Sequence, residues 1–291
     1  MKQPLLYLFL FFFAAQAYAA AQKNTMAVLT QESGAYMEAF TAFQTAYGTD
    51  VEFFNVSQGG PEFPPGVRTV VAFGGKAANY PYPPGFNIVY CMAPGIVITP
   101  KGREGKTVKI RMTPGFGLIL SKFKEIQPSL KRLRIFWMLP EFSADAEALR
   151  ELGAARDIQI SLIKVQNLGE LPGLLRDGLK EMDAFWVPPD PLLISRESLR
   201  LLRDFSWGNS IPFYASNKGL AREGATAAVG LSFADIGAAA ASAVKTIQEG
   251  GSPAPFIFPD KVELTLNASA ARKCGLEFPA KILREADYLF P

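Results

Sequence analysis

The 291-residue chain is 49% hydrophobic and 20% charged, which is enough apolar material for one large domain or two domains of ordinary size. Its formal net charge is only +3 and it has no block of basic residues, so the charge pattern argues against nucleic acid as a partner. The chain contains no histidine, which excludes Ser-His-Asp and Cys-His catalysis and zinc sites built on histidine.

The first residues have the pattern of a secretory signal peptide. Lys2 precedes an apolar run from Leu5 to Ala15, which is too short to cross a bilayer comfortably. Ala17-Tyr18-Ala19 then fits a small-x-small cleavage site. We therefore predict a signal peptide over residues 1–19 and export of the remainder to the periplasm. An uncleaved membrane anchor is the alternative.

The first half of the chain alternates short apolar runs with a helical pattern. Tyr36, Phe40, Phe43 and Tyr47 recur at helical spacing, and Gly48 follows as a stop signal. Strands are expected at residues 26–30, 51–56, 69–73, 87–92 and 107–112.

The second half repeats this alternation. Strands are expected at residues 133–139, 158–165, 184–187, 211–215, 227–231 and 262–266. Helices are expected at residues 143–153, 169–182, 195–205 and 233–250, with Ser143 as the N-cap of the first. Strands that alternate with helices favour parallel sheets covered on both faces, and two such series predict two α/β lobes.

The stretch "DAFWVPPDPLL" (183–193) ends a buried strand at a fixed point. Pro188 and Pro189 cannot donate to a sheet ladder, so the strand ends at Val187 and Asp190 follows it. Ligands of parallel α/β sheets bind outside the carboxyl ends of the strands. We expect Asp190 to present an exposed carboxylate there. Capping of the following helix is the alternative, and the two roles are compatible.

The two cysteines, Cys91 and Cys274, both lie in apolar stretches. An exported protein can form a disulfide, but apolar surroundings are typical of buried free thiols. We expect no bond between them.

Four segments carry the pattern of a known family from about Phe123 to the end of the chain. They are "FKEIQPSLKRLRIFW", "DAFWVPPD", "IPFYASNKGLAREGATAAVGLSFADIG" and "LNASAARKCGLEFPAKILREAD". In combination they resemble the substrate-binding proteins of a bacterial ABC importer family associated with tryptophan and tyrosine. The resemblance implies a type I periplasmic binding protein: an α/β fold of two Rossmann-like lobes with parallel sheets, joined by a hinge of three crossing segments.

This resemblance also implies an organisation and a function. The N-terminal lobe would hold residues 20–113 plus 234–257, and the C-terminal lobe residues 114–233 plus 258–291. The protein would capture a small organic ligand between its lobes, for example an aromatic amino acid or a related compound, and deliver it to the membrane permease of an ABC importer. It would act as a monomer, without a cofactor, a metal or an enzymatic activity. The alternative is a periplasmic ligand sensor that signals to a membrane receptor without transport, and a periplasmic hydrolase ranks third.

The sequence departs from the family pattern at positions expected to meet the ligand. Asn217 stands where the family has an acidic residue after Ala-Ser, and Ser232-Phe233 stands where it has Asp-Tyr. A buried ammonium group needs charged or multiple acceptors, so Glu32 and Glu141, each just after a predicted strand, could replace the missing carboxylates.

The candidate ligand-binding residues all follow predicted strands. They are Gln31, Glu32, Tyr36, Gly75 and Lys76 in the first lobe and Glu141, Phe142, Asp190, Tyr214, Asn217, Ser232 and Phe233 in the second. In "AFGGKAA" two glycines would let a backbone approach an anion at a helix N-terminus, and Lys76 would add to that preference. Phe142, Tyr214 and Phe233 would stack on a flat ligand, or else form part of the core.

The sequence offers little support for an enzyme. Two S-x-x-K matches begin at Ser121 and Ser161, but neither has the partner motifs of penicillin-binding enzymes. A Walker A loop and a G-x-G-x-x-G fingerprint are both absent from the sequence.

Overall fold

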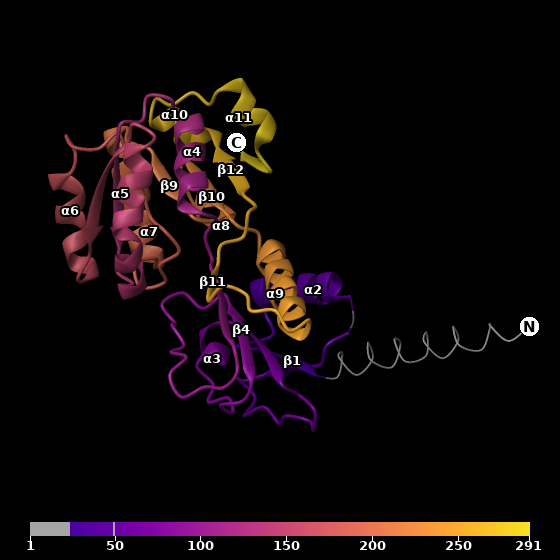
Figure 1. Cartoon of the computed structure of the whole chain (residues 1–291). Coiled ribbons are helices and arrows are strands. Elements are labelled where there is room, and N and C mark those ends of the chain that lie inside the picture. Colours follow the sequence, from indigo (N-terminus) through magenta and orange to yellow (C-terminus); the bar gives the residue numbers. More distant parts are fainter. Residues whose placement is uncertain (1–23, 49) are drawn as a thin grey trace, which may run out of the picture. The chain divides into compact units, whose positions relative to one another are not determined.

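The computed structural model describes residues 24–48 and 50–291, and the predicted signal peptide therefore lies outside the described residues (Figure 1). These residues form two compact units. Unit 1 contains the described residues up to Arg111 together with Phe233–Ile257, and unit 2 contains Met112–Ser232 together with Phe258–Pro291. The chain therefore passes between the units three times. None of the helices in the described part of the chain is both long and apolar enough to span a membrane.

Unit 1 is built on a six-stranded sheet in which every pair of neighbours is parallel. The strands, in the order in which they lie in the sheet, are β11 (Phe256–Ile257), β5 (Thr107–Ile110), β4 (Asn87–Cys91), β3 (Thr69–Phe73), β1 (Thr25–Leu29) and β2 (Phe53–Asn55). Every residue of the central strands β1 and β3 is buried. Continuous apolar runs of this kind form the middle of a sheet that is covered on both faces.

Helices α2 (Gly34–Tyr47) and α9 (Phe233–Gln248) pack side by side in unit 1 (Figure 1). Their backbones come so close that a Cβ atom at Gly237 would lie 2.0 Å from the carbonyl oxygen of Ala39. The rings of Phe40 and Phe43 both pack edge-on against Phe73 of β3. The helical spacing of aromatic residues in α2 therefore marks its buried face, as predicted. The third helix, α3 (Gly75–Ala78), is a single turn.

Unit 2 is built on a seven-stranded sheet that is parallel except where β10 and β12 run antiparallel. The strands, in the order in which they lie in the sheet, are β13 (Tyr288–Phe290), β12 (Glu263–Asn267), β10 (Ala227–Gly230), β9 (Phe213–Ala215), β8 (Ala184–Trp186), β6 (Arg132–Trp137) and β7 (Gln159–Lys164). The α/β fold with two lobes and predominantly parallel sheets is confirmed.

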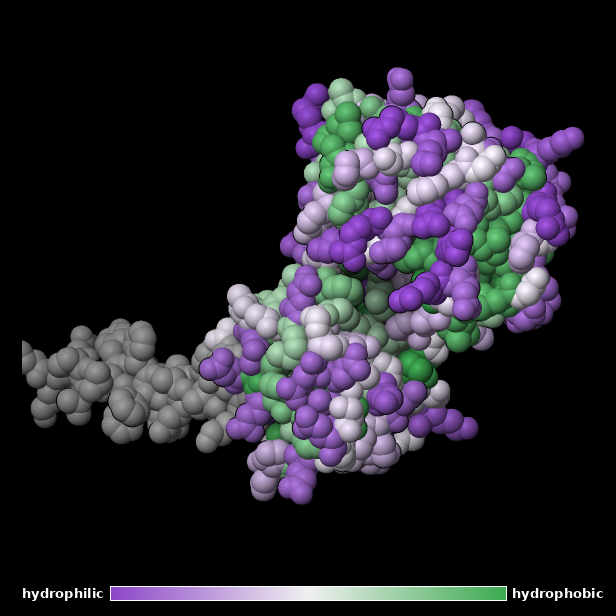
Figure 2. Space-filling view, turned by 180° about the vertical axis from the view of Figure 1, so that it is seen from behind, coloured by the Kyte–Doolittle hydropathy of each residue, from purple (hydrophilic) through white to green (hydrophobic). Residues whose placement is uncertain are grey.

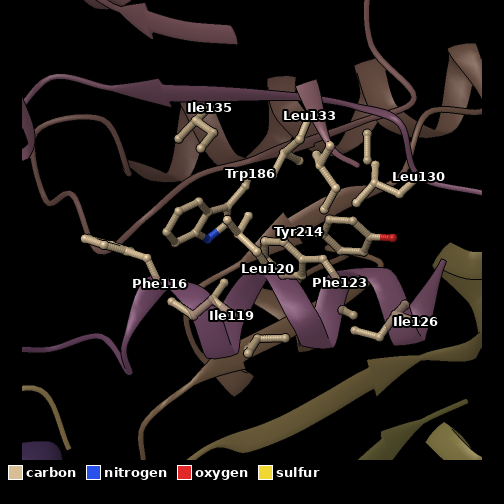
Figure 3. Close-up of a cluster of buried hydrophobic side chains, with 14 of the residues drawn as sticks. Phe116, Ile119, Leu120, Phe123, Ile126, Leu130, Leu133, Ile135, Trp186 and Tyr214 are labelled. Atoms are coloured by element: carbon tan, nitrogen blue, oxygen red, sulfur yellow. The ribbon is translucent and has the colours of Figure 1, made fainter. Parts of the chain in front are cut away.

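Helices cover both faces of this sheet. They are α4 (Phe116–Ile126), η1 (Pro140–Asp145), α5 (Ala146–Ala154), η2 (Leu168–Glu170), α6 (Leu171–Asp177), α7 (Arg196–Asn209), α8 (Lys218–Arg222), α10 (Ala268–Lys273) and α11 (Ala280–Glu285). Neighbouring residues of β8 point to opposite faces: Trp186 belongs to the core cluster that includes α4 (Figure 3), whereas Phe185 belongs to the cluster that includes α7. Hydrophobic residues also reach the surface between hydrophilic ones (Figure 2).

Several elements differ from the sequence-based expectation. The helix expected from Ser143 begins at Ala146, because Pro140–Asp145 form a 3-10 helix. The helix expected over residues 169–182 is the shorter α6. The strands β11 and β13 were not predicted, since two or three residues are too few to show a periodic pattern. Cys91 and Cys274 are both buried and free, as expected, and lie in different units.

Candidate functional site

The loops that follow the parallel strands gather on one edge of each sheet, which we call the carboxyl edge of that unit. In unit 1 this edge receives the ends of β1, β3 and β4. In unit 2 it receives the ends of β6, β8, β9 and β10. This is the edge at which open α/β sheets bind ligands.

A close contact at the carboxyl edge of unit 1 requires glycine at position 74. Gly74 has φ +98°, and a Cβ atom there would lie 2.5 Å from Thr30 Oγ1 and 2.6 Å from Tyr36 Cε1. Thr30 Oγ1 in turn accepts a hydrogen bond from the N–H of Ala77 at 3.2 Å. Gly74 therefore lets the loops after β1 and β3 pack directly on each other, and it places the half-buried Tyr36 ring beside them.

This contact leaves fewer free backbone N–H groups for the anion site that was expected at the start of α3. The helix has only one turn, and the N–H of Ala77 already donates to Thr30. Gly75 is half-buried and the side chain of Lys76 is exposed. The exposed ammonium group of Lys76 is the charged group of this loop that could attract an anion.

Gln31 and Glu32 are both exposed, and both are oriented by neighbours. Gln31 Nε2 donates to Ser33 Oγ at 2.8 Å, and Glu32 Oε1 accepts from Asn55 Nδ2 at 3.2 Å. The hydrogen bond to Asn55, the last residue of β2, holds the Glu32 carboxylate at the carboxyl edge.

Met92 lies on this edge, as its place at the end of a predicted strand suggested, but its conformation was not revealed by the sequence. We expected Met92 to continue β4, whereas the strand ends at Cys91 and Met92 adopts φ 54°. A left-handed conformation is uncommon for a residue with a long side chain, and it turns the chain sharply at the strand end. The carbonyl oxygen of Cys91 accepts the N–H of Gly74 at 2.9 Å, so this turn lies beside the Gly74 loop.

Asp190 differs from the expectation of an exposed carboxylate, because its side chain is only 3% exposed. Its Oδ2 accepts the N–H groups of Met138 at 2.5 Å and Leu139 at 2.9 Å. Its Oδ1 accepts the N–H groups of Leu192 at 3.0 Å and Leu193 at 3.1 Å. Four backbone donors therefore compensate the burial of this charge.

The consequence is a positioning role for Asp190. It ties the loop after β6 to the loop after β8, and so fixes the start of η1, which carries Glu141. The alternative expectation, that Asp190 caps α7, also differs from the structure, since Ser195 is the N-cap of that helix and forms a capping box with Ser198.

Tyr214 and Phe142 lie in the core of unit 2 instead of at its surface. Tyr214 is fully buried, stacks on Phe123 with ring centroids 4.5 Å apart, and donates its hydroxyl hydrogen to Gln127 Oε1 at 2.7 Å. Burial, with a smaller contribution from Cys274, raises the pKa of Tyr214 well above its ordinary value. Phe142 is 7% exposed and packs against Trp137, with the two ring centroids 5.4 Å apart. Both side chains therefore serve the core, which was the alternative to stacking on a ligand.

The remaining candidates stay closer to the surface. Asn217 is exposed and caps α8, with its Oδ1 accepting the N–H of Leu220 at 3.1 Å. Glu141 is half-buried in η1. Ser232 and Phe233 are half-buried where the chain passes between the units, Ser232 as the last residue of a unit 2 segment and Phe233 as the first of α9.

Two further observations concern what the protein could bind: a groove in unit 2, and the search of the described residues for a metal site. A groove of about 500 Å³ lies between α6 and α7 and is lined by Pro172, Leu175, Arg176, Glu197, Arg200, Leu201, Asp204 and Phe205, none of which is a candidate from the sequence. Within residues 24–48 and 50–291, no cluster of three or more cysteine, aspartate or glutamate side chains could hold a metal ion.

Comparison with known sequences gives one family and one relative. Residues 119–289 match the family model described as ABC transporter substrate binding protein. A segment of 122 residues is 29% identical to the Uncharacterized protein RP367 of Rickettsia prowazekii. That segment is 42% of this chain and 40% of the relative, so the match spans less than half of either protein.

Comparison with solved structures gives neighbours with the same fold. A Clostridium difficile substrate binding protein with adhesive properties, CD0873, superimposes with a TM-score of 0.67 at 16% identity over 91% of this chain and 98% of its own. An ABC domain from Streptococcus pneumonia in complex with L-Trp gives a TM-score of 0.62 at 15% identity over 91% and 100%. A conserved domain protein from Vibrio cholerae gives 0.60 at 13% identity over 91% and 98%. At these identities the likeness shows the fold.

Proposed function

The chain belongs to the family of ABC transporter substrate binding proteins, and from this premise we propose that it is the periplasmic component of an ABC importer. It captures a small organic ligand with the carboxyl-edge loops of both lobes and presents it to a membrane permease. The three passages of the chain between the units would act as the hinge on which the lobes close.

The observation that carries this proposal is the composition of the two carboxyl edges. Each unit gathers polar and aromatic side chains of different strand-end loops on the one edge of its sheet that suits a ligand. Tyr36, Glu32 and Lys76 lie on this edge in unit 1. Glu141 and Asn217 lie on it in unit 2.

We propose an aromatic amino acid, or a compound of similar shape and charge, as the ligand. The half-buried rings of Tyr36 and Phe233 could stack on a flat ligand. Glu32 or Glu141 could accept hydrogen bonds from an ammonium group, and the exposed Lys76 could pair with a carboxylate. The buried Asp190 has no part in this scheme, since all its hydrogen bonds are made to backbone groups of unit 2.

Thermal unfolding with a panel of solutes tests the ligand class. L-tryptophan and L-tyrosine represent the proposed class, and glucose and ribose represent neutral ligands. At a hundredfold excess over its dissociation constant, a true ligand stabilises the folded protein by about 2.7 kcal/mol. If none of the amino acids raises the melting temperature, the ligand class is wrong, while the family and fold remain.

Lys76→Ala then tests the carboxylate partner. The variant should bind an amino acid about tenfold more weakly, because it loses a charge-assisted hydrogen bond. Lys101→Ala, at another exposed lysine of unit 1, is the matched control and should bind as the wild type does. Equal affinities of the two variants would remove Lys76 from the site.

Uptake measurements separate transport from sensing. A strain without this protein should lose high-affinity uptake of the radiolabelled ligand, and expression of the protein should restore it. Uptake that is unchanged by the deletion, together with a lost transcriptional response to the ligand, would support the sensor and contradict the importer.

A further inference from the structure

Lys109 is the most deeply buried charged residue in the part of the chain that the structure describes. It lies in β5 between the buried residues Val108 and Ile110, and it is only 2% exposed. An ammonium group removed from water is costly unless it finds hydrogen-bond partners. Lys109 Nζ donates to the carbonyl oxygen of Ile96 at 2.8 Å. This partner belongs to residues 93–98, which follow β4 at the carboxyl edge of unit 1 and which we call the β4 loop.

A second side chain holds the β4 loop from the same sheet. Tyr90 of β4 is the residue that pairs with Lys109 of β5 in the parallel register. Tyr90 Oη accepts the N–H of Ile98 at 3.2 Å, and Lys109 Nζ lies 5.9 Å from the centre of the Tyr90 ring. Ile96 and Ile98 pack on the core cluster that includes Tyr90. Two neighbouring side chains therefore fix the backbone of the β4 loop on this face of the sheet.

The β4 loop turns sharply and reaches the start of α3. Met92 adopts φ 54° just before the loop, and Gly95 adopts φ 78° within it. Two left-handed residues within four positions give the chain a course that its own hydrogen bonds do not maintain. A Cβ atom at Gly75 would lie 3.8 Å from Ile96 Cγ1, which is an ordinary van der Waals distance. Ile96 therefore packs beside the residue that directly precedes Lys76.

We propose that Lys109 is a positioning residue for ligand binding. It fixes the β4 loop so that Ile96 supports the turn at Gly75, and the ammonium group of Lys76 is thereby held where it meets the carboxylate of the ligand. This role rests on the proposed function. It adds that the preference for a ligand with a carboxylate depends on a side chain too deeply buried to touch that ligand. A ligand without this charge gains little from the arrangement, so Lys109 acts on specificity more than on binding in general.

Isothermal titration calorimetry with L-tryptophan and L-tryptophanamide tests the proposal. The amide lacks the negative charge of the carboxylate, so the wild type should bind L-tryptophan about tenfold more tightly than the amide. Lys109→Met keeps the length of the side chain but removes the donor, and it should reduce this ratio of affinities to about threefold or less.

Lys106→Met is the matched control for Lys109→Met. Lys106 Nζ also donates to a backbone carbonyl oxygen, that of Gly251. Gly251 lies in the segment before β11, which runs parallel to β5, so this contact is at the opposite edge of the sheet. Lys106→Met should therefore keep the ratio of affinities within about twofold of the wild-type ratio.

A combined variant separates positioning from a general loss of structure. Because Lys109 acts through Lys76, the double variant Lys76→Ala/Lys109→Met should have the same ratio of affinities as Lys76→Ala alone. Tyr90→Phe removes the second support of the β4 loop but keeps the ring, and it should also lower the ratio. Thermal unfolding should show that every variant is folded.

The possible results distinguish this role from the proposed function. A wild type that binds neither compound would contradict the proposed ligand class, and one that binds both equally would contradict the pairing of Lys76 with a carboxylate; the role of Lys109 falls in either case. If Lys76→Ala lowers the ratio but Lys109→Met does not, only the role of Lys109 is overturned. Weaker binding of both compounds by the same factor in Lys109→Met would also overturn it, because a general loss of structure does not discriminate between them.

Discussion

Asp190 lies between two loops of unit 2, and its carboxylate accepts four backbone N–H groups. At the scale of single residues this is the contact that shapes the carboxyl edge most, because it joins the ends of β6 and β8. Asp190, in the loop after β8, therefore acts on the site indirectly, by fixing the backbone of the two loops to which it is hydrogen-bonded.

Asp190→Asn should lower the free energy of unfolding by about 3 kcal/mol. The amide replaces one acceptor oxygen with a donor, so two buried N–H groups lose their partner. Urea unfolding at pH 7 measures the change. Asp177→Asn, at an exposed position of α6, is the control and should change stability by less than about 0.5 kcal/mol. Equal stability of the two variants would show that the four hydrogen bonds contribute little.

At the scale of elements, Asp183 joins the beginning of β8 to the beginning of β6. Its Oδ2 accepts the N–H groups of Lys131 at 2.9 Å and Arg132 at 2.8 Å, and its Oδ1 accepts Arg132 Nη2 at 2.7 Å. Partial burial acts to raise the pKa of Asp183, but the hydrogen bonds from Arg132 and from the two backbone N–H groups outweigh it and hold the pKa below its ordinary value of 3.8.

This depressed pKa predicts an acid-dependent loss of stability. The contribution of Asp183 is present above the pKa of the unfolded chain, near 3.8, and is lost as the pH falls through the lower pKa of the folded protein. Asp183→Asn should therefore be less stable than the wild type at pH 7, and the difference should shrink as the pH falls from about 4 to about 2. Urea unfolding across this range measures it. A difference that does not depend on pH would contradict the assigned ion pair.

The packing of α2 against α9 depends on Gly237, since a Cβ atom there would lie 2.0 Å from the carbonyl oxygen of Ala39. Gly237→Ala should destabilise the protein, although alanine favours a helix by about 1 kcal/mol over glycine. Gly208→Ala in α7 is the matched control: no atom lies within 4 Å of its added Cβ, so helix propensity alone should act and stabilise slightly. Thermal unfolding measures both. Stabilisation by Gly237→Ala would contradict the close approach of the two helices.

At the scale of the whole molecule, each unit is assembled from segments far apart in the chain. β12, from the last segment, pairs with β10 and buries Leu264 and Leu266 in the core of unit 2. A chain that ends at residue 257 should therefore fail to form unit 2, whereas one that ends at residue 287 loses only the short edge strand β13 and Pro291 and should fold. Circular dichroism with thermal unfolding distinguishes the two. Cooperative unfolding of unit 2 in the shorter chain would show that β12 is dispensable.

Much of the fold could be predicted because its signals are local. The strand at Thr69–Phe73 is a continuous apolar run, and the aromatic residues of α2 repeat at helical spacing. The limits of elements were less predictable: Met92 leaves β4 for a left-handed turn, and Pro140–Asp145 form a 3-10 turn before α5. These depend on how a strand end meets neighbouring loops, which no local pattern records.

The amino-acid pattern alone was enough for the class of this protein: alternating strands and helices indicated two predominantly parallel α/β sheets, and the segments after Phe123 indicated the family of substrate-binding proteins. The roles of the polar and aromatic residues at the strand ends became visible only once the folded arrangement of the sheets was known. Asp190 finds its donors Met138 and Leu139 more than fifty residues earlier in the chain, and Tyr214 finds Gln127 eighty-seven residues earlier. A buried polar group is stable only with a hydrogen-bond partner, and partners this distant in the chain become neighbours only when the sheet of unit 2 is assembled.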